Sequence, residues 1–231
     1  IKMFKTLFII LPLLFLLIKS NLYGIDVSYH NGEIDFSKIK SKVDFVIMRA
    51  GYGNKTTDSK EVKFDIYYEE AKKNNIPVGT YWYCYAYTPE QALIEAKTFL
   101  NKVKGKKFEF PVYYDVEEAE ILDTGYDNVN ALINTFCGEL EKNNYYCGLY
   151  SSSNYLKSLI SEEIKQKYAI WVAHWGVDKP SYQGPWGIWQ YTSDGNMDGV
   201  ESERLDLDVA VINYEPIIKF LGKNGYDKFS K

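Results

Sequence analysis

The stretch FPVYYDVEEAE, residues 110–120, joins an apolar and aromatic run to a cluster of acids. Aromatic and β-branched residues favour strands, so the run predicts a strand that ends in carboxylates. Asp115 and Glu117 are two residues apart and face the same way on an extended chain, about 6.6 Å apart along the backbone. The stretch therefore predicts a strand that presents two carboxyl groups at its C-terminal end.

Strand-like and helix-like segments alternate on both sides of this stretch. Five successive strand–helix units favour a parallel sheet, which is expected to close into a barrel. The strands are expected at residues 23–29, 44–53, 78–87, 108–117 and 145–151, and the helical patterns lie near residues 35–41, 59–75, 88–104, 127–144 and 154–167.

The pattern changes towards the end of the chain. Strand-like segments at residues 169–175, 186–193 and 203–211 are separated by short connections rich in Gly, Pro and Asp. A parallel crossover needs about a dozen residues or more and usually contains a helix, so these strands are expected to be antiparallel. The predicted fold class is α/β: a TIM-like barrel of five βα units closed by about three mostly antiparallel strands.

The beginning of the chain has the features of an export signal. Lys2 and Lys5 precede the apolar run Leu7–Ile18, which contains Pro12 and is shorter than the roughly 20 residues that span a bilayer. We expect residues 1–22 to be a signal peptide cleaved between Ser20 and Tyr23. The rest, residues 23–231, is then one catalytic domain that is secreted or enters an endolysosomal or phagosomal lumen, with no stable membrane association.

Composition narrows the class of protein further. The 231 residues are 46% hydrophobic and 16% aromatic, enough for one sizeable core. The net charge is −4, and removing residues 1–22 takes away three lysines and no acid, which makes it −7. The sequence contains no basic block, so a nucleic-acid partner has no electrostatic support. We expect an acidic enzyme that acts as a monomer.

The cysteines and one sequon bear on export. Cys84, Cys137 and Cys147 are an odd number, so at least one is unpaired within the chain. Cys137 lies on the apolar face of an expected helix and Cys147 in the strand that follows, so these two could form a disulfide or remain as buried thiols. Asn54 begins an Asn-Lys-Thr glycosylation sequon and is expected to be exposed in a loop.

Acids end three of the expected strands. Asp26 ends the first strand, Asp115 and Glu117 end the fourth, and Asp206 and Asp208 lie in the last. A single such aspartate is more often a helix cap or a solvated loop residue. Because parallel barrels place their chemistry at the C-terminal ends of the strands, the recurrence on three strands predicts an active site there.

Paired carboxyl groups at such a mouth suggest cleavage of glycosidic bonds. A protein nucleophile needs carboxyl groups about 5–5.5 Å apart, and a wider pair suits inversion through water or attack by the substrate's own acetamido group. Burial beside other acids raises the pKa of at least one member, and Glu117 is our choice of acid. We expect no cofactor or metal, although a hydrolase that binds Mg²⁺ or Ca²⁺ through these acids is a rival hypothesis.

Eight short stretches carry a resemblance to a known family. They read, in order, GIDVSYHNG, FVIMRAGYG, VGTYWYCYA, PVYYDVEE, CGLYSS, IWVAHW, IWQYTSDG and LDLDVA. In them the chain resembles glycoside hydrolase family 25, the Chalaropsis-type muramidases or lysozymes. The resemblance implies a flattened barrel that cleaves the β-1,4 bond between N-acetylmuramic acid and N-acetylglucosamine in bacterial peptidoglycan.

The resemblance also implies roles for individual acids. Glu117 corresponds to the general acid, Asp115 to the carboxylate that positions or stabilises the acetamido group, and Asp26 and Asp206 to flanking acids. A chitinase-like glycosidase and an inactive glycan-binding relative are the alternatives. The chain departs from the family's usual Asp-x-Asn at Asp208, which we expect to act as an added negative charge, so that Asp208→Asn moves the alkaline fall of the rate to lower pH.

Aromatic residues and one arginine complete the predicted site. Tyr83 and Tyr150 resemble aromatic positions near the scissile sugar, and Trp189 is singled out with them because sugar faces stack on exposed rings. Arg49 is expected to be a buried partner of a site carboxylate. His174 is expected to be structural, since two histidines in the chain are too few for a usual zinc hydrolase site.

Overall fold

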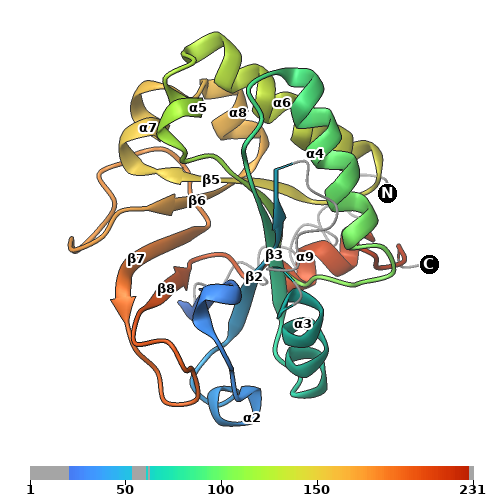
Figure 1. The fold of residues 1–231 in the computed structure, drawn as a ribbon, viewed down its shortest axis with the longest axis vertical. Coiled ribbons are helices and arrows are strands. Elements are labelled where there is room, and N and C mark those ends of the chain that lie inside the picture. Colours follow the sequence, from blue (N-terminus) through green and yellow to red (C-terminus); the bar gives the residue numbers. More distant parts are fainter. Residues whose placement is uncertain (1–20, 54–60, 62, 229–231) are drawn as a thin grey trace, which may run out of the picture.

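In the part of the chain that the structure describes, eight strands close into one barrel in the order β1 to β8 (Figure 1). The computed structural model describes residues 21–53, 61 and 63–228. The expected signal peptide, apart from its last two residues, and the sequon at Asn54 lie outside these ranges. The strands are β1 (Leu22–Val27), β2 (Phe45–Tyr52), β3 (Val78–Tyr83), β4 (Val112–Asp115), β5 (Cys147–Ser152), β6 (Ala169–Ala173), β7 (Ile188–Gly195) and β8 (Leu205–Ala210).

The strand directions confirm the α/β barrel and refine how it closes. Strands β1 to β7 pair in parallel, each with the next, and β8 pairs antiparallel with both β7 and β1. The antiparallel closure at β8 was expected, but β6 and β7 were expected to be antiparallel and instead extend the parallel set. Residues 174–187 between them return the chain without a helix, because this connection is long enough to cross by itself.

Helices cover one side of the barrel. Helices α3, α4 and α6 flank the part of the barrel made by β2 to β5, and β7 and β8 lie on the other side (Figure 1). The helical elements are η1 (Tyr29–Asn31), α2 (Phe36–Ile39), α3 (Lys63–Lys73), α4 (Pro89–Lys102), α5 (Ala119–Leu122), α6 (Tyr126–Lys142), α7 (Ser153–Ser158), α8 (Glu162–Lys167) and α9 (Tyr214–Leu221).

Local sequence signals explain where these helices begin and end. Thr88 caps α4 by accepting a hydrogen bond from the Gln91 N–H, and Pro89 occupies the first turn, where its missing N–H costs nothing. Helix α9 ends at Gly222, whose φ of 64° is a left-handed conformation that favours glycine. Among the described helices, none is long and apolar enough to cross a membrane.

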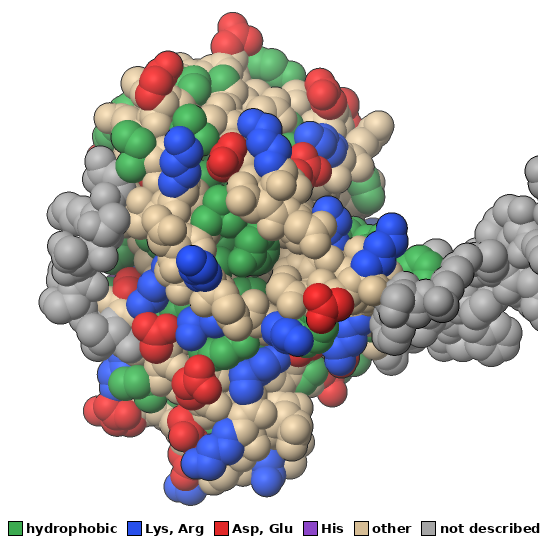
Figure 2. Space-filling model, turned by 90° about the vertical axis from the view of Figure 1, so that its right-hand side faces the viewer, with side chains coloured by type: hydrophobic (Ala, Val, Ile, Leu, Met, Phe, Trp, Pro, Cys, Tyr) green, Lys and Arg blue, Asp and Glu red, His purple; other side chains and the backbone are tan. Residues whose placement is uncertain are grey.

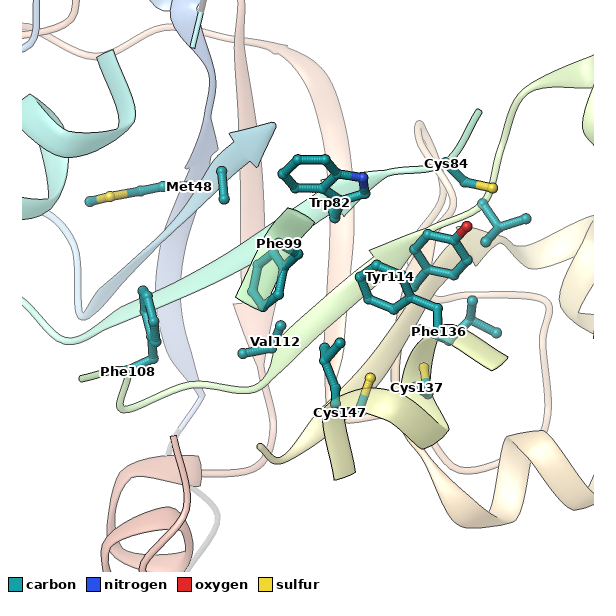
Figure 3. Packing of buried hydrophobic residues seen from close by; sticks show 14 of the residues in the cluster. Met48, Trp82, Cys84, Phe99, Phe108, Val112, Tyr114, Phe136, Cys137 and Cys147 are labelled. Atoms are coloured by element: carbon teal, nitrogen blue, oxygen red, sulfur yellow. The ribbon is translucent and has the colours of Figure 1, made fainter. Parts of the chain in front are cut away.

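Two apolar cores lie on the two sides of the barrel wall. The inner core fills the barrel with large side chains, including Phe45, Tyr113 and Trp171. The outer core packs between the strands and the helices, where Tyr114 of β4 stacks on Phe136 of α6 with ring centroids 3.9 Å apart (Figure 3). Neighbouring residues on β4 thus face opposite cores, and this alternation points Asp115 inwards at the end of the strand.

The outer core also contains the three cysteines, which are buried and free. Cys137 of α6 and Cys147 of β5 lie close together (Figure 3), and both thiols donate to the Gly148 carbonyl, at 3.8 and 3.7 Å. Of the two states that the sequence left open, the structure has the buried thiols.

The start of the barrel differs by one residue from the expected domain boundary. Leu22 is already part of β1 and pairs with Ala210 of β8. A domain that began at Tyr23 would lack this pairing.

Candidate active site

The C-terminal ends of the parallel strands surround a cavity of about 510 Å³. It lies where strand alternation directs the inward-facing residues at the strand ends. The cavity is lined by Asp26, Ser28, His30, Asn31, Arg49, Tyr81, Tyr83, Asp115, Glu117, Tyr150, Trp171, Trp175, Gln190, Ser193, Ser202, Arg204 and Asp206. All four acids predicted for the site are brought together here.

The register of β1 and β8 places the acids of these two strands. Asp26 is opposite Asp206, and Gly24 is opposite Asp208. These four positions, and with them the side chains of the three aspartates, face the barrel interior. Asp206 is partly exposed and lines the cavity, whereas Asp208 is fully buried one layer deeper. The structure therefore places Asp206, and not Asp208, where a substrate could reach it.

Asp115 and Glu117 differ in their surroundings. Asp115 ends β4 and is 4% exposed, whereas Glu117 lies just beyond the strand and is exposed at the mouth. The Glu117 carboxylate is within hydrogen-bond contact of the hydroxyl groups of Tyr83 and Tyr150. Two phenols thus hold the more accessible carboxyl group in place.

The surroundings raise the pKa values of these acids. Burial raises the pKa of Asp115 well above its usual range, and the charge of Glu117 adds to this effect. The pKa of Glu117 is also raised, chiefly because neighbouring residues shield the carboxyl group from water, and the negative charge of Asp206 adds to this effect. Burial raises the pKa of Asp206 to about 6, although Arg204 opposes the change. The site can therefore keep at least one carboxyl group protonated in mildly acidic water.

A glutamine that the sequence analysis missed connects the walls of the cavity. Gln190 of β7 is 3% exposed, and its Nε2 donates to Asp26 Oδ2 at 2.8 Å. Its Oε1 accepts from the Tyr150 hydroxyl and from Trp175 Nε1, both at 2.9 Å. Gln190 thus fixes a catalytic candidate, Asp26, relative to two aromatic residues.

Arg49 pairs with an acid that the sequence analysis did not name. Its Nε donates to Glu61 Oε1 in a mostly buried ion pair, and its guanidinium lies over the rings of Tyr29 and Tyr52. The prediction of a site carboxylate as its direct partner was wrong, because Glu61 occupies that position. Arg49 still lines the cavity, and its charge opposes the rise in the pKa of Asp115.

The aromatic residues are placed differently from the prediction in one case. Tyr83 and Tyr150 line the cavity as predicted, but Trp189 is not among its lining residues. Trp189 alternates with the inward Gln190, so it faces outwards beside Trp186 and donates its Nε1–H to the His174 carbonyl at 2.8 Å. The tryptophans that line the cavity are instead Trp171 and Trp175.

A second hollow adjoins the first. It measures about 290 Å³ and is lined by Glu117, Tyr150, Ser152, Ser153, Asn154, Ala173, His174 and Trp175. Because Glu117, Tyr150 and Trp175 line both hollows, Glu117 lies where one hollow meets the other. A chain of sugars that occupied both would pass Glu117.

The described residues offer no metal site, and His174 has a structural contact. Within the described ranges, no group of three or more His, Cys, Asp or Glu side chains is arranged to hold a metal ion. His174 Nδ1 accepts a hydrogen bond from the Ser181 N–H at 3.0 Å, which agrees with the structural role expected for it.

The fold and this mouth define a class of protein. A closed barrel with several acids at the C-terminal ends of its strands is an arrangement that glycosidases use. The sequence matches the family model described as glycosyl hydrolases family 25 over residues 25–200, and the chain belongs to that family.

Individual relatives agree with this assignment. The chain is 28% identical over 186 residues to the autolytic lysozyme of Clostridium acetobutylicum, covering 80% of this chain and 54% of that protein. The modular autolysin LytC from Streptococcus pneumoniae, solved in complex with a synthetic peptidoglycan ligand, has a TM-score of 0.71 and 27% identity, over 82% of this chain and 46% of that one. The chain thus spans about half the length of both relatives.

A third comparison concerns the fold alone. The bacterial lysozyme from Streptomyces coelicolor has a TM-score of 0.74 and 22% identity, over 89% of this chain and 98% of that one. The barrel described above is therefore similar to that of a lysozyme along nearly its whole length.

Proposed function

We propose that the chain is a lysozyme that hydrolyses the β-1,4 bond between N-acetylmuramic acid and N-acetylglucosamine in bacterial peptidoglycan. The observation that carries the proposal is the convergence of Asp26, Asp115, Glu117 and Asp206 on one cavity. Membership of family 25 and a relative solved with a synthetic peptidoglycan ligand support the choice of substrate.

Glu117 is the general acid in this proposal. It is the exposed carboxyl group at the junction of the two hollows, so it can reach the oxygen of a bond that crosses from one to the other. Its raised pKa keeps the proton that it must donate to the leaving oxygen. The Tyr83 hydroxyl can donate to the carboxylate once the proton has left, since the Tyr150 hydroxyl already donates to Gln190.

Asp115 is the carboxylate that positions the acetamido group. Its Oδ1 is buried and has no hydrogen-bond partner among the described residues. A buried carboxylate oxygen without a donor is costly, and an acetamido N–H of the substrate would provide that donor. Such a contact directs the acetamido oxygen towards the sugar carbon, which suits attack by the substrate's own group.

Asp26 and Asp206 flank the reacting sugar from the opposite wall. Their negative charge would stabilise the positive charge that develops on the sugar in the transition state. Trp175, which is exposed and lines both hollows, has the role expected of Trp189 as a ring on which a sugar face can stack.

The test is the loss of turbidity of a bacterial wall suspension, followed by mass analysis of the released fragments. We expect new reducing ends of N-acetylmuramic acid, and a loss of roughly 10²–10⁴ in rate for Glu117→Gln with the fold intact. Glu120→Gln is the matched control, because Glu120 is exposed on α5 and does not line the cavity.

Each alternative predicts a different result in the same assay. Fragments that end in N-acetylglucosamine, or faster digestion of chitin than of walls, would favour a chitinase-like enzyme. Wall binding without release of fragments would favour a glycan-binding relative. Inhibition by a chelator, reversed by Mg²⁺ or Ca²⁺, would favour the metal-dependent hydrolase.

We further propose that the chain is exported and acts as a monomer without stable membrane association. The apolar run Leu7–Ile18 after Lys2 and Lys5 supports export. N-terminal sequencing of the secreted protein tests this proposal, with a new terminus at Asn21 or Leu22 as the expected result. Light scattering of the secreted protein gives its mass in solution.

A further inference from the structure

Two buried aspartates beneath the mouth, Asp26 of β1 and Asp208 of β8, face the barrel interior on paired strands, and their carboxyl groups lie close enough to interact. Asp26 is 4% exposed and Asp208 is 0% exposed. An ionised carboxylate only accepts hydrogen bonds, so two ionised aspartates side by side repel each other, whereas a pair that holds one proton can form a hydrogen bond.

The other contacts of the two groups leave a defined place for that proton. Trp171 Nε1 donates to Asp208 Oδ1 at 2.7 Å, and Gln190 Nε2 donates to Asp26 Oδ2 at 2.8 Å. Asp208 Oδ2 is buried, and no donor among the described residues reaches it. A proton on Asp208 Oδ2 removes the cost of an unpaired buried anion and turns this oxygen into a donor towards Asp26.

Access to water decides which aspartate keeps the charge. Asp26 lines the cavity of about 510 Å³, whereas Asp208 does not. A negative charge is therefore better solvated on Asp26 than on Asp208. Burial is the largest cause of the raised pKa of both groups, and repulsion from Asp206 adds to it.

We propose that Asp208 is a positioning residue that stays protonated at working pH and donates a hydrogen bond to Asp26, so that the pair holds one negative charge on Asp26 at the mouth. Trp171 fixes Asp208 from one side, and Gln190 fixes Asp26 from the other. Only the expected effect on rate rests on the proposed function.

The groups around Asp208 favour this state. Asp208 faces Asp26 of β1 and Asp206 of its own strand, β8. The phenols of Tyr191 on β7 and Tyr113 on β4 are also close enough to interact electrostatically with Asp208. These neighbours are acids or phenols. Arg204 acts on Asp206 instead. In the unfolded chain an aspartate titrates near pH 3.9, so the folded protein holds one proton more than the unfolded chain at higher pH.

Unfolding by urea at several values between about pH 5 and 7 tests the proposal without an activity measurement. One extra proton in the folded state raises the unfolding constant about tenfold for each unit of pH. Asp208→Asn removes this contribution while its amide oxygen still accepts from Trp171 and its amide N–H still donates to Asp26. The slope of the logarithm of the unfolding constant against pH should fall by about one. Asp178→Asn, at an exposed residue, is the control and should leave the slope unchanged.

An equal slope in wild type and Asp208→Asn, or failure of Asp208→Asn to fold, overturns the proposal. The rate on bacterial walls adds a second readout. Asp208→Ala should lower kcat/KM about tenfold or more, because it removes the donor to Asp26, and Asp208→Asn should restore most of that loss. If the wild type proves inactive, the proposed function fails while the slopes still decide the state of Asp208.

The pH dependence of the rate separates a neutral Asp208 from the charged residue expected from the sequence alone. A neutral Asp208 adds no charge near Glu117, so Asp208→Asn should leave the alkaline fall in place. A fall that moves to lower pH in Asp208→Asn would show that Asp208 carries charge and would overturn the proposal.

Discussion

Glu95 of α4 is a buried carboxyl group that lies behind the rim of the mouth. It is 1% exposed; its Oε1 accepts from the Tyr85 N–H at 2.9 Å, and its Oε2 accepts from the Tyr114 hydroxyl at 2.7 Å. Burial raises the pKa of Glu95 to about 7, against the pull of these two hydrogen bonds. The residue thus links the loop after β3, which carries Tyr85, to the outer core.

This raised pKa makes stability depend on pH in a defined direction. The folded state binds the proton of Glu95 more tightly than the unfolded chain does, so its contribution is fully present below about pH 4.5 and is lost as pH rises through about 7. Relative to Glu95→Gln, the wild type should lose about 3 kcal/mol of unfolding free energy over this range. Chemical denaturation of both proteins across the range measures the difference, and parallel profiles would contradict the assignment.

The residues of the site differ in how far sequence could predict them. Asp26, Asp115, Glu117 and Asp206 were predictable because acids at the ends of barrel strands have few other reasons to recur. Gln190 carried no comparable signal, since its role depends on contacts with Asp26 on β1 and Tyr150 on β5, far away in sequence.

Trp189 illustrates a further limit at the same scale. A barrel strand has a core on each side, so both of its faces can be apolar. On β7 the sequence offers Trp189 and Gln190 as neighbours, and hydrophobicity alone suggests the wrong one for the cavity. The register with β6 and β8 decides it, and this register is not visible in one strand.

At the scale of the elements, β5 shows how tightly a barrel strand is packed. Gly148 lies where an added Cβ would come within 2.4 Å of the Tyr113 ring and 2.7 Å of the Ala169 carbonyl oxygen. Neither contact can be relieved easily. The Tyr113 ring is packed in the inner core, and the Ala169 oxygen belongs to the backbone of β6. A side chain at this position would force the two strands and their core apart.

We therefore expect Gly148→Ala to lower the free energy of unfolding by about 1–3 kcal/mol or more. Gly138→Ala is the matched control, because a Cβ there meets no other described atom within 4 Å and Gly138 lies inside α6. The control should be more stable by roughly 0.5–1 kcal/mol, as alanine favours a helix. Urea unfolding of the two variants gives both values, and a neutral Gly148→Ala would show that β5 can shift.

Most elements were predictable because strand and helix patterns alternate clearly up to β5. The direction of β6 and β7 was not, since the rule that links parallel strands to helical crossovers describes the usual case. The segment 174–187 has another use, because it brings His174 and Trp175 to the rim of the second hollow.

At the scale of the whole molecule, charges of both signs lie close together on the face that carries α3 and α4. Figure 2 shows lysines and acids interspersed on the face that carries α3 and α4. Asp65 of α3 pairs there with Lys102 at 2.7 Å and Lys106 at 3.0 Å. Exposed pairs of this kind contribute little to stability, so the acidic balance of the chain matters more for its approach to a charged substrate.

The last prediction concerns the pH at which the enzyme works best. Glu117 must be protonated to donate, and its pKa is raised, so the rate should fall as pH rises through that value. On the acid side the rate should fall as Asp206, with a pKa of about 6, and the other flanking acids lose their charge. Bacterial walls are often anionic, and repulsion from an acidic chain at neutral pH acts in the same direction as the loss of the Glu117 proton. We therefore expect a rate maximum below pH 7 in wall digestion.

Repeating the profile at higher ionic strength separates the two causes, since salt screens long-range repulsion but leaves the protonation of Glu117 nearly unchanged. An alkaline maximum, or an alkaline fall that disappears with salt, would show that protonation of Glu117 does not limit the rate.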